Sequence, residues 1–84
     1  MRAVSVLPDY CLAITCNDGT KGVVDLSVLV NSPGAGIFAA LKDVQVFQEV
    51  TIELGVITWP NGADLSPEWV HEEVGQKKTW SIPN

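Results

Sequence analysis

The sequence has few basic residues, and they are scattered. Lys and Arg number 5 against 10 Asp and Glu, which gives a net charge of −5, and only Lys77 and Lys78 are adjacent. Nucleic-acid binding depends mainly on Lys and Arg that neutralise phosphates. We therefore expect no direct nucleic-acid binding by this chain. The acidic balance suits a basic protein partner, or it serves only to keep a small protein soluble.

Long apolar runs are also absent. No segment approaches the ~20 consecutive apolar residues that a membrane helix requires. The apolar stretch at the N-terminus ends at Pro8-Asp9, which makes it too short for the core of a signal peptide. The sequence therefore predicts a cytoplasmic protein that does not enter a membrane.

The sequence has only two cysteines and one histidine, His71. On one extended strand, Cys11 and Cys16 would lie roughly 16 Å apart on opposite faces, whereas a disulfide needs Cα atoms within ~7 Å. We expect two free thiols. Cys-x4-Cys with one distant histidine is a poor zinc set, and His71 is expected to be an exposed helical residue. No metal or cofactor is predicted.

No catalytic motif is complete. The segment Gly34-Ala35-Gly36 lacks the Gly-Lys-Ser/Thr ending of a P-loop and the third glycine of a dinucleotide fingerprint. His71 has no identifiable nucleophile and orienting acid. Asp64 and Glu68 could form a carboxylate pair, but Asp64 is more simply explained as a turn and capping residue. We assign no catalytic residue and expect the chain not to be an enzyme.

The order of elements predicts an α+β domain. Strands are expected over residues 2–7, 10–16, 20–25, 44–54 and 56–59, and helices over 35–41 and from Ser66-Pro67 to Gly75. Residues 27–30 are expected to form a turn or a helical stub. The predicted order, β-β-β-α-β-β-α, describes a small, mainly antiparallel sheet with two short helices. Residues 1–75 would form one domain, followed by a tail, 76–84, that is disordered unless Trp80 docks.

Serine can cap a helix, and proline is tolerated at its first position, so Ser66-Pro67 starts the last helix. Its inward face is predicted to hold Trp69, Val70 and Val74. The preceding segment, Trp59-Pro60-Asn61-Gly62-Ala63-Asp64, is typical of a rigid corner, in which Asn61 and Asp64 bind backbone amides. The same corner and the tail supply our candidate partner contacts, which are Trp59, Asn61, Asp64, Trp69 and Trp80.

The closing segment also carries a resemblance. "WPNGADLSPEWV", at the end of a domain of this length, resembles a widespread bacterial family called domain of unknown function 2442. The similarity runs from about Val4 to Glu73. It includes Asp18-Gly19, Val24-Asp25-Leu26, Phe38, Leu41, Asp43, Phe47 and the segment from Trp59 to Pro67.

The resemblance implies a small α+β fold without an established activity. Some members carry a C-terminal helix-turn-helix domain, which has no counterpart in the few residues after the last helix here. Others are encoded beside small proteins similar to RelE-type toxins, which implies an antitoxin or regulatory role.

The sequence thus predicts a non-enzymatic protein-interaction or regulatory domain, with a small, basic, RelE-like toxin as the most specific partner. The contact surface would be an exposed strand edge, the Trp59–Trp69 corner or the tail. The alternative is a small-ligand-binding or enzymatic domain with a pocket near Trp59, Asp64 and Trp69. The oligomeric state is left open.

Overall fold

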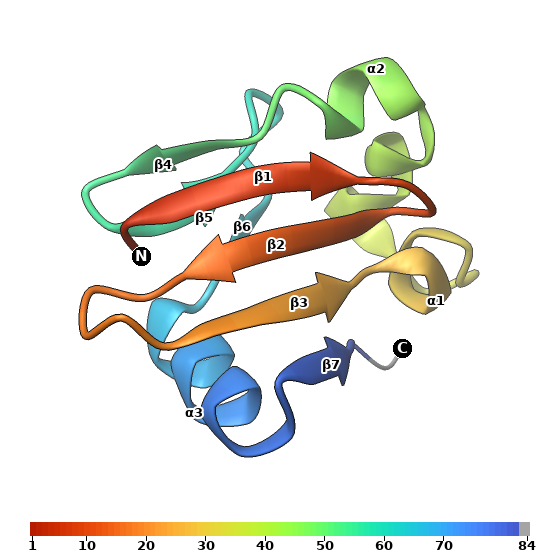
Figure 1. Ribbon diagram of the computed structural model, residues 1–84. Helices are drawn as coiled ribbons and strands as arrows, with labels where there is room; N and C mark the ends of the chain where they lie inside the picture. Colours follow the sequence, from red (N-terminus) through yellow and green to blue (C-terminus); the bar gives the residue numbers. More distant parts are fainter. Residues whose placement is uncertain (83–84) are drawn as a thin grey trace.

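The protein is described by a computed structural model in which residues 1–82 are placed (Figure 1). The strands are β1 (Ala3–Leu7), β2 (Cys11–Thr15), β3 (Lys21–Asp25), β4 (Thr51–Glu53), β5 (Val56–Thr58), β6 (Asp64–Leu65) and β7 (Thr79–Ser81). The helices are α1 (Ser27–Val30), the 3₁₀ helix η1 (Gly36–Lys42), α2 (Val44–Phe47) and α3 (Pro67–Lys77). The predicted α+β class is confirmed.

The three N-terminal strands, predicted over residues 2–7, 10–16 and 20–25, form a meander that makes up most of a four-stranded sheet in the order β1-β2-β3-β7. Strands β1, β2 and β3 are antiparallel neighbours, with Ser5 opposite Ala13 and Ala13 opposite Val23. The turn between β2 and β3 contains Gly19 at a φ of +91°, the positive φ that an Asp-Gly pair such as Asp18-Gly19 readily adopts in a tight hairpin. Strand β7 lies parallel to β3 at the far edge, with Val24 opposite Trp80.

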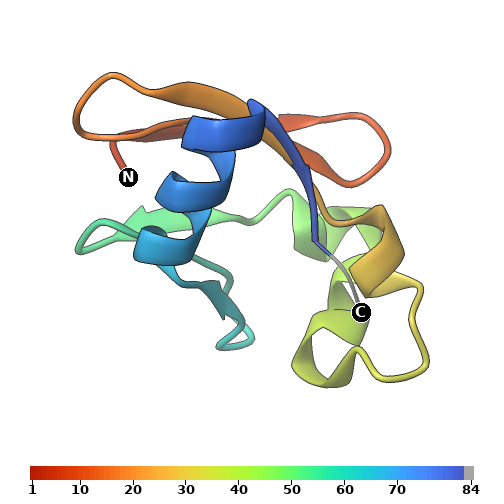
Figure 2. The same ribbon diagram turned by 90° about the horizontal axis from the view of Figure 1, so that it is seen from below.

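A second layer covers one face of this sheet (Figure 2). It contains α3 and a small antiparallel sheet in the order β4-β5-β6. The core lies between the layers, and its largest fully buried side chains are Phe47, Leu12, Leu26, Leu41, Ile57, Val24, Val70 and Val74. Leu12 and Ile14 point into this core from β2, as their alternation in sequence predicts. None of the helices within residues 1–82 is long and apolar enough to cross a membrane.

The predicted strand over residues 44–54 is wrong in its first half. Residues Val44–Phe47 form α2, because the Asp43 side chain accepts a hydrogen bond from the Gln45 amide (3.0 Å) and caps a helical turn. This turn buries Phe47. The strand itself is confined to β4, and Leu54, the last residue of the predicted strand, lies fully exposed in the β4–β5 turn with a φ of +52°.

The last helix begins where predicted but ends later. Ser66 caps α3 by accepting a hydrogen bond from the Trp69 amide, and Val70 and Val74 are buried. However, Gly75 is not the C-cap, because the helix continues to Lys77 and Lys78 adopts a positive φ of 60°. Trp69, predicted to face inward, is instead 46% exposed.

The chain after α3 contains a strand that the sequence pattern did not predict. Trp80 is only 4% exposed and Ile82 3%, and both belong to the core. The Ile82 amide donates a hydrogen bond to the Asp25 carbonyl (2.9 Å), which continues the β3–β7 ladder. The tail therefore meets the condition set for its ordering, which was that Trp80 docks. Residues 83–84 of that tail lie outside the described part of the chain.

Candidate functional site

The predicted contact residues do not form one exposed surface. Trp59 is 2% exposed, and its indole Nε1–H donates to the Phe47 carbonyl (3.0 Å). Trp80 is also buried, and the Trp80 and Trp69 rings pack in an edge arrangement, with ring centroids 4.7 Å apart. Of the three tryptophans, only Trp69 therefore presents substantial surface to a partner.

Asn61 and Asp64 have different roles. The Asn61 side chain donates to the Ile37 carbonyl (3.1 Å) and accepts from the Ala63 amide (3.1 Å), so it holds the corner as the sequence predicts. Asp64 lies exposed in β6, and its side chain makes no hydrogen bond to residues 1–82. Its predicted capping role is wrong, because Ser66 performs it.

Because Ser66 and not Asp64 caps α3, we expect substitutions at the two positions to affect stability differently. Ser66→Ala should lower the free energy of unfolding by about 1 kcal/mol, the usual result of losing an N-cap. Asp64→Ala, on the same segment, should change it by less than ~0.5 kcal/mol. Urea melts of the two variants measure both values. An equal loss in the two proteins would contradict the assignment of the cap.

Within residues 1–82, the structure also does not form the ligand pocket that the alternative hypothesis places near Trp59, Asp64 and Trp69. An open hollow of about 420 Å³ lies beside Trp59 and is lined by Thr51, Glu53, Thr58, Trp59, Pro60 and Gly62. Neither Asp64 nor Trp69 lines it. The three residues named for this pocket therefore do not meet around one cavity.

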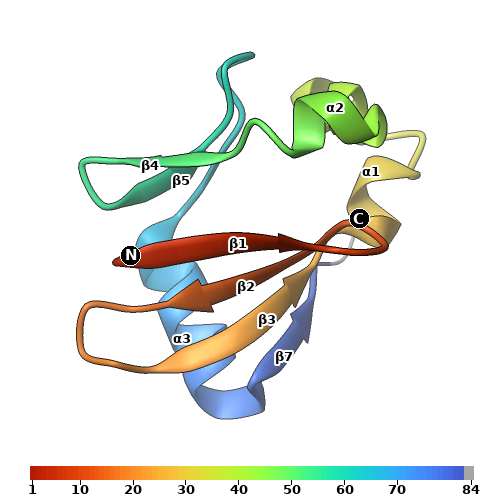
Figure 3. The same ribbon diagram turned by 45° about the horizontal axis from the view of Figure 1, so that its top comes forward.

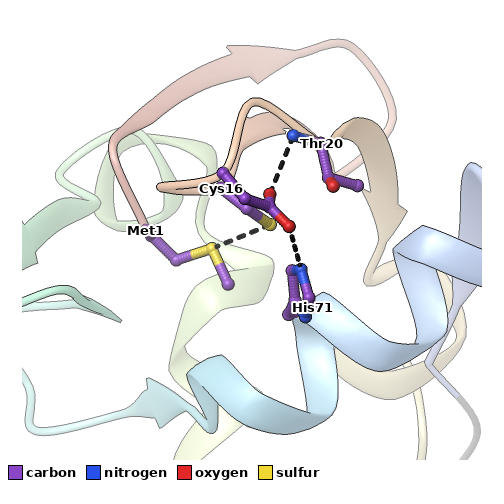
Figure 4. A network of polar contacts seen from close by, with 5 residues as sticks. Met1, Cys16, Thr20 and His71 are labelled. Atoms are coloured by element: carbon purple, nitrogen blue, oxygen red, sulfur yellow. Dashed lines mark hydrogen bonds and ion pairs between the residues drawn. The ribbon is translucent and has the colours of Figure 1, made fainter.

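A polar cluster instead forms where the β2–β3 turn meets α3 (Figure 4). His71 Nε2 lies 2.8 Å from Asp18 Oδ2, and Asp18 Oδ1 accepts a hydrogen bond from the Thr20 amide (3.0 Å). The buried Cys16 Sγ lies beside them, 3.8 Å from Met1 Sδ. One ligand atom each from Cys16, Asp18 and His71 lies within 4.8 Å of the other two.

The electrostatics of the cluster follow from these contacts. The Thr20 amide and then the His71 ring hold the pKa of the Asp18 carboxyl well below its usual range. Burial, and to a lesser degree the Asp18 charge, raises the pKa of the Cys16 thiol. Cys16 is therefore a neutral thiol at pH 7, next to an ionised carboxylate.

The sequence pattern did not reveal this cluster. Cys16 and Asp18 are close in sequence, but His71 is 53 residues from Asp18 and was expected to be simply exposed. It is half exposed and also paired. Only the packing of α3 under the β2–β3 turn brings the three side chains together.

The two cysteines should differ in reactivity. Both are free in the structure, with Cys16 buried and Cys11 half-buried on the opposite face of β2. We expect thiol titration to find two reactive groups in the unfolded chain, and in the folded chain Cys11 to react faster than Cys16. Equal rates in the folded chain, or a pair released only by a reductant, would contradict this placement.

The first sheet also has an open edge at β1. The Cys16 amide donates a hydrogen bond to the Thr20 carbonyl, on the β3 side. Because successive peptide groups of an antiparallel strand point to opposite neighbours, the peptide groups of Cys11, Ala13 and Thr15 point toward β1. The peptide groups of Val4 and Val6 consequently point away from β2. β4 lies close to β1 in the other layer (Figure 3), but among residues 1–82 no strand other than β2 pairs with β1.

The outer face of the same sheet is not covered by the second layer (Figure 2). Across its middle, Ser5 of β1, Ala13 of β2 and Val23 of β3 lie opposite one another and are uncharged, whereas the neighbouring row, Ala3, Thr15 and Lys21, ends in a lysine. An open hollow of about 450 Å³ lies over these rows, and Lys21 and Lys78 are among the residues that line it.

Comparison with known families assigns residues 1–73 to the family described as "Protein of unknown function (DUF2442)". The chain belongs to this family. The match confirms the resemblance inferred from the closing segment. No curated protein and no solved structure matches the chain.

The DUF2442 match includes β1, the Cys16–Asp18–His71 cluster and the closing corner. It ends within α3, so β7 and Trp80 lie beyond it. The two arrangements that offer groups to a ligand or a partner, the β1 edge and the cluster, thus both lie inside the DUF2442 part of the chain.

Proposed function

We propose that this DUF2442 chain is a cytoplasmic, non-enzymatic protein-interaction domain that receives a strand of its partner along the free edge of β1. The partner in the most specific form of the proposal is a small, basic, RelE-like toxin that the domain neutralises. The observation that supports the proposal best is an unprotected edge. Exposed edge strands usually carry charges, proline or a bulge that prevents pairing with another chain. Residues Ala3–Leu7 contain no charge and no proline.

The side chains around this edge favour binding as well. Val6 is 37% exposed on one side of β1, and Ser5 and Ala13 leave the outer face flat beside it. Small side chains lose little rotamer freedom when they are covered. A partner strand added at β1 would form hydrogen bonds with the peptide groups of Val4 and Val6 and would cover this surface.

The charge of the chain supports a basic partner. The net charge of −5 would attract a basic protein over distances of about a Debye length and accelerate association. The exposed side of α3 contributes Glu68 and Glu72 to this field. The uncharged edge would then provide the direct contact.

Co-expression with the product of the neighbouring reading frame tests the function. The chain should form a stable complex with a small basic protein encoded there, seen as one peak in size-exclusion chromatography, and should relieve its growth inhibition. If co-expression yields neither a complex nor restored growth, the antitoxin proposal fails and the ligand-binding alternative takes its place.

Two matched variants test the contact surface. Ser5 and Ser81 lie exposed on the two edge strands of the same sheet, β1 and β7. Ser5→Lys places on the proposed edge a lysine, the kind of residue that prevents an edge strand from pairing with another chain. It should weaken the complex at least ~10-fold, which corresponds to about 1.4 kcal/mol. Ser81→Lys should bind as the unmodified chain does. Equal binding by both variants would exclude the β1 edge.

A further inference from the structure

Three metal-binding side chains meet at one point of the structure. Cys16 directly follows β2, Asp18 lies in the turn after it and His71 lies in the second turn of α3. Cys16 and His71 lie close together in Figure 4. Their ligand atoms lie within 4.8 Å of one another. We propose that Cys16 Sγ, a carboxylate oxygen of Asp18 and His71 Nε2 bind a zinc ion, and that the Cys16 thiol releases its proton to solvent as the ion binds. This inference is independent of the proposed function.

The ligand types and spacing fit this ion. Zinc takes thiolate, imidazole and carboxylate ligands in a tetrahedral arrangement with bonds of about 2.0–2.3 Å, which places ligand atoms ~3.3–3.8 Å apart. The observed contacts span that range, from 2.8 Å between Asp18 and His71 to at most 4.8 Å. The side chains of Asp18 and His71 are about half exposed. Their torsion angles can therefore adjust to an ion more freely than those of buried side chains.

The site has support beyond its ligands. The Thr20 amide bonds to Asp18 Oδ1 and orients the carboxylate, so that Oδ2 faces His71. Such outer hydrogen bonds are a regular feature of metal sites. Burial on the inner face of the sheet holds Cys16 in place. The ion would replace one exposed hydrogen bond with three coordinate bonds between the β2–β3 turn and α3.

The fourth position of the ion would be open to a ligand. Three protein ligands leave one tetrahedral position free, as in zinc sites that bind water or a small anion. An open hollow of about 350 Å³ lies at the cluster, and Met1, Pro67 and Glu68 also line it. The class of ligand that fits is therefore water or a small oxygen donor that enters through this hollow.

Titration of the full chain with zinc, after treatment with a chelator, tests the proposal. Calorimetry should show one ion per chain, and zinc should raise the melting temperature by mass action on the folded state. Cobalt provides a second probe, because coordination by Cys16 should give a thiolate-to-cobalt charge-transfer band.

The controls come from the same elements. His71→Ala and Cys16→Ser should each weaken zinc binding more than ~10-fold, because the loss of a residue that only hydrogen-bonds to a ligand already lowers metal affinity by about that factor. Cys16→Ser should also abolish the cobalt band. Glu72→Ala, next to His71 on α3, and Cys11→Ser, on the other face of β2, should bind zinc normally. His71→Ala replaces an exposed residue, so its folding is not in question. Absence of one-to-one binding, or binding that His71→Ala leaves unchanged, would overturn the proposal.

Discussion

Gly22→Ala is expected to destabilise the protein by about 3 kcal/mol or more, the upper end of the range for overpacking. A Cβ atom on Gly22 would collide with the Val74 side chain and with the backbone carbonyl of Lys78. The backbone cannot move aside there, because the Lys78 carbonyl accepts a hydrogen bond from the Val23 amide (2.7 Å). The added methyl group would force β3 away from α3 and β7. A denaturant melt measures the loss.

Gly75→Ala provides the matched control. Gly75 lies in α3, and a Cβ atom there would meet nothing within 4 Å. Alanine is favoured over glycine inside a helix by ~0.5–1 kcal/mol. The same substitution should therefore stabilise the protein at position 75 and destabilise it at position 22. Similar midpoints for the two variants would contradict the close approach of α3 and β3.

Trp80→Ala should cost ~3–5 kcal/mol, as is usual for a buried tryptophan. Trp80 fills the space between β3, α3 and Trp69, and its loss would also release β7 from the sheet. Trp69→Ala is the comparison and should cost less, because Trp69 is 46% exposed and loses only part of the burial of a core tryptophan, together with the aromatic contact, which is worth about 0.5–1.5 kcal/mol. Thermal or urea melts distinguish the two. A Trp80→Ala protein as stable as the Trp69→Ala protein would show that β7 contributes little to the fold.

Local signals in the sequence were sufficient to predict the strands of the N-terminal meander and the residue at which α3 starts. The alternation at Leu12 and Ile14, the Asp18-Gly19 turn and the Ser66-Pro67 cap each depend on neighbouring residues only, and the structure confirms all three. The family resemblance was also confirmed, because the family model matches residues 1–73.

Other features depend on contacts between distant residues. Trp80 orders the tail only because β3 and α3 provide a place for it. The segment after Asp43 has an alternating pattern, yet a single side-chain cap and the burial of Phe47 favour α2 over a strand. Gly75 was a reasonable helix end by residue type, but α3 extends until Lys78 can adopt a positive φ beside β3.

The candidate sites also depend on contacts between distant residues, which local sequence patterns do not show. An exposed strand edge was among the predicted contact surfaces, and the structure identifies β1 as a strand with one unpaired edge within residues 1–82. Trp59 was expected to contact a partner because it lies in a rigid corner, but its indole N–H is satisfied by Phe47 in the core. The Cys16–Asp18–His71 cluster could not be predicted, since no spacing rule connects a hairpin turn to a helix more than fifty residues away.

Hydrogen–deuterium exchange of the complex with the co-purified partner tests the central claim, that a partner strand pairs with β1. The Val4 and Val6 amides point away from β2 and should exchange quickly in the free chain. In the complex they should become strongly protected, while the Thr79 and Ser81 amides on the opposite edge remain as they were. Protection that appears elsewhere, with Val4 and Val6 still exchanging quickly, would contradict it.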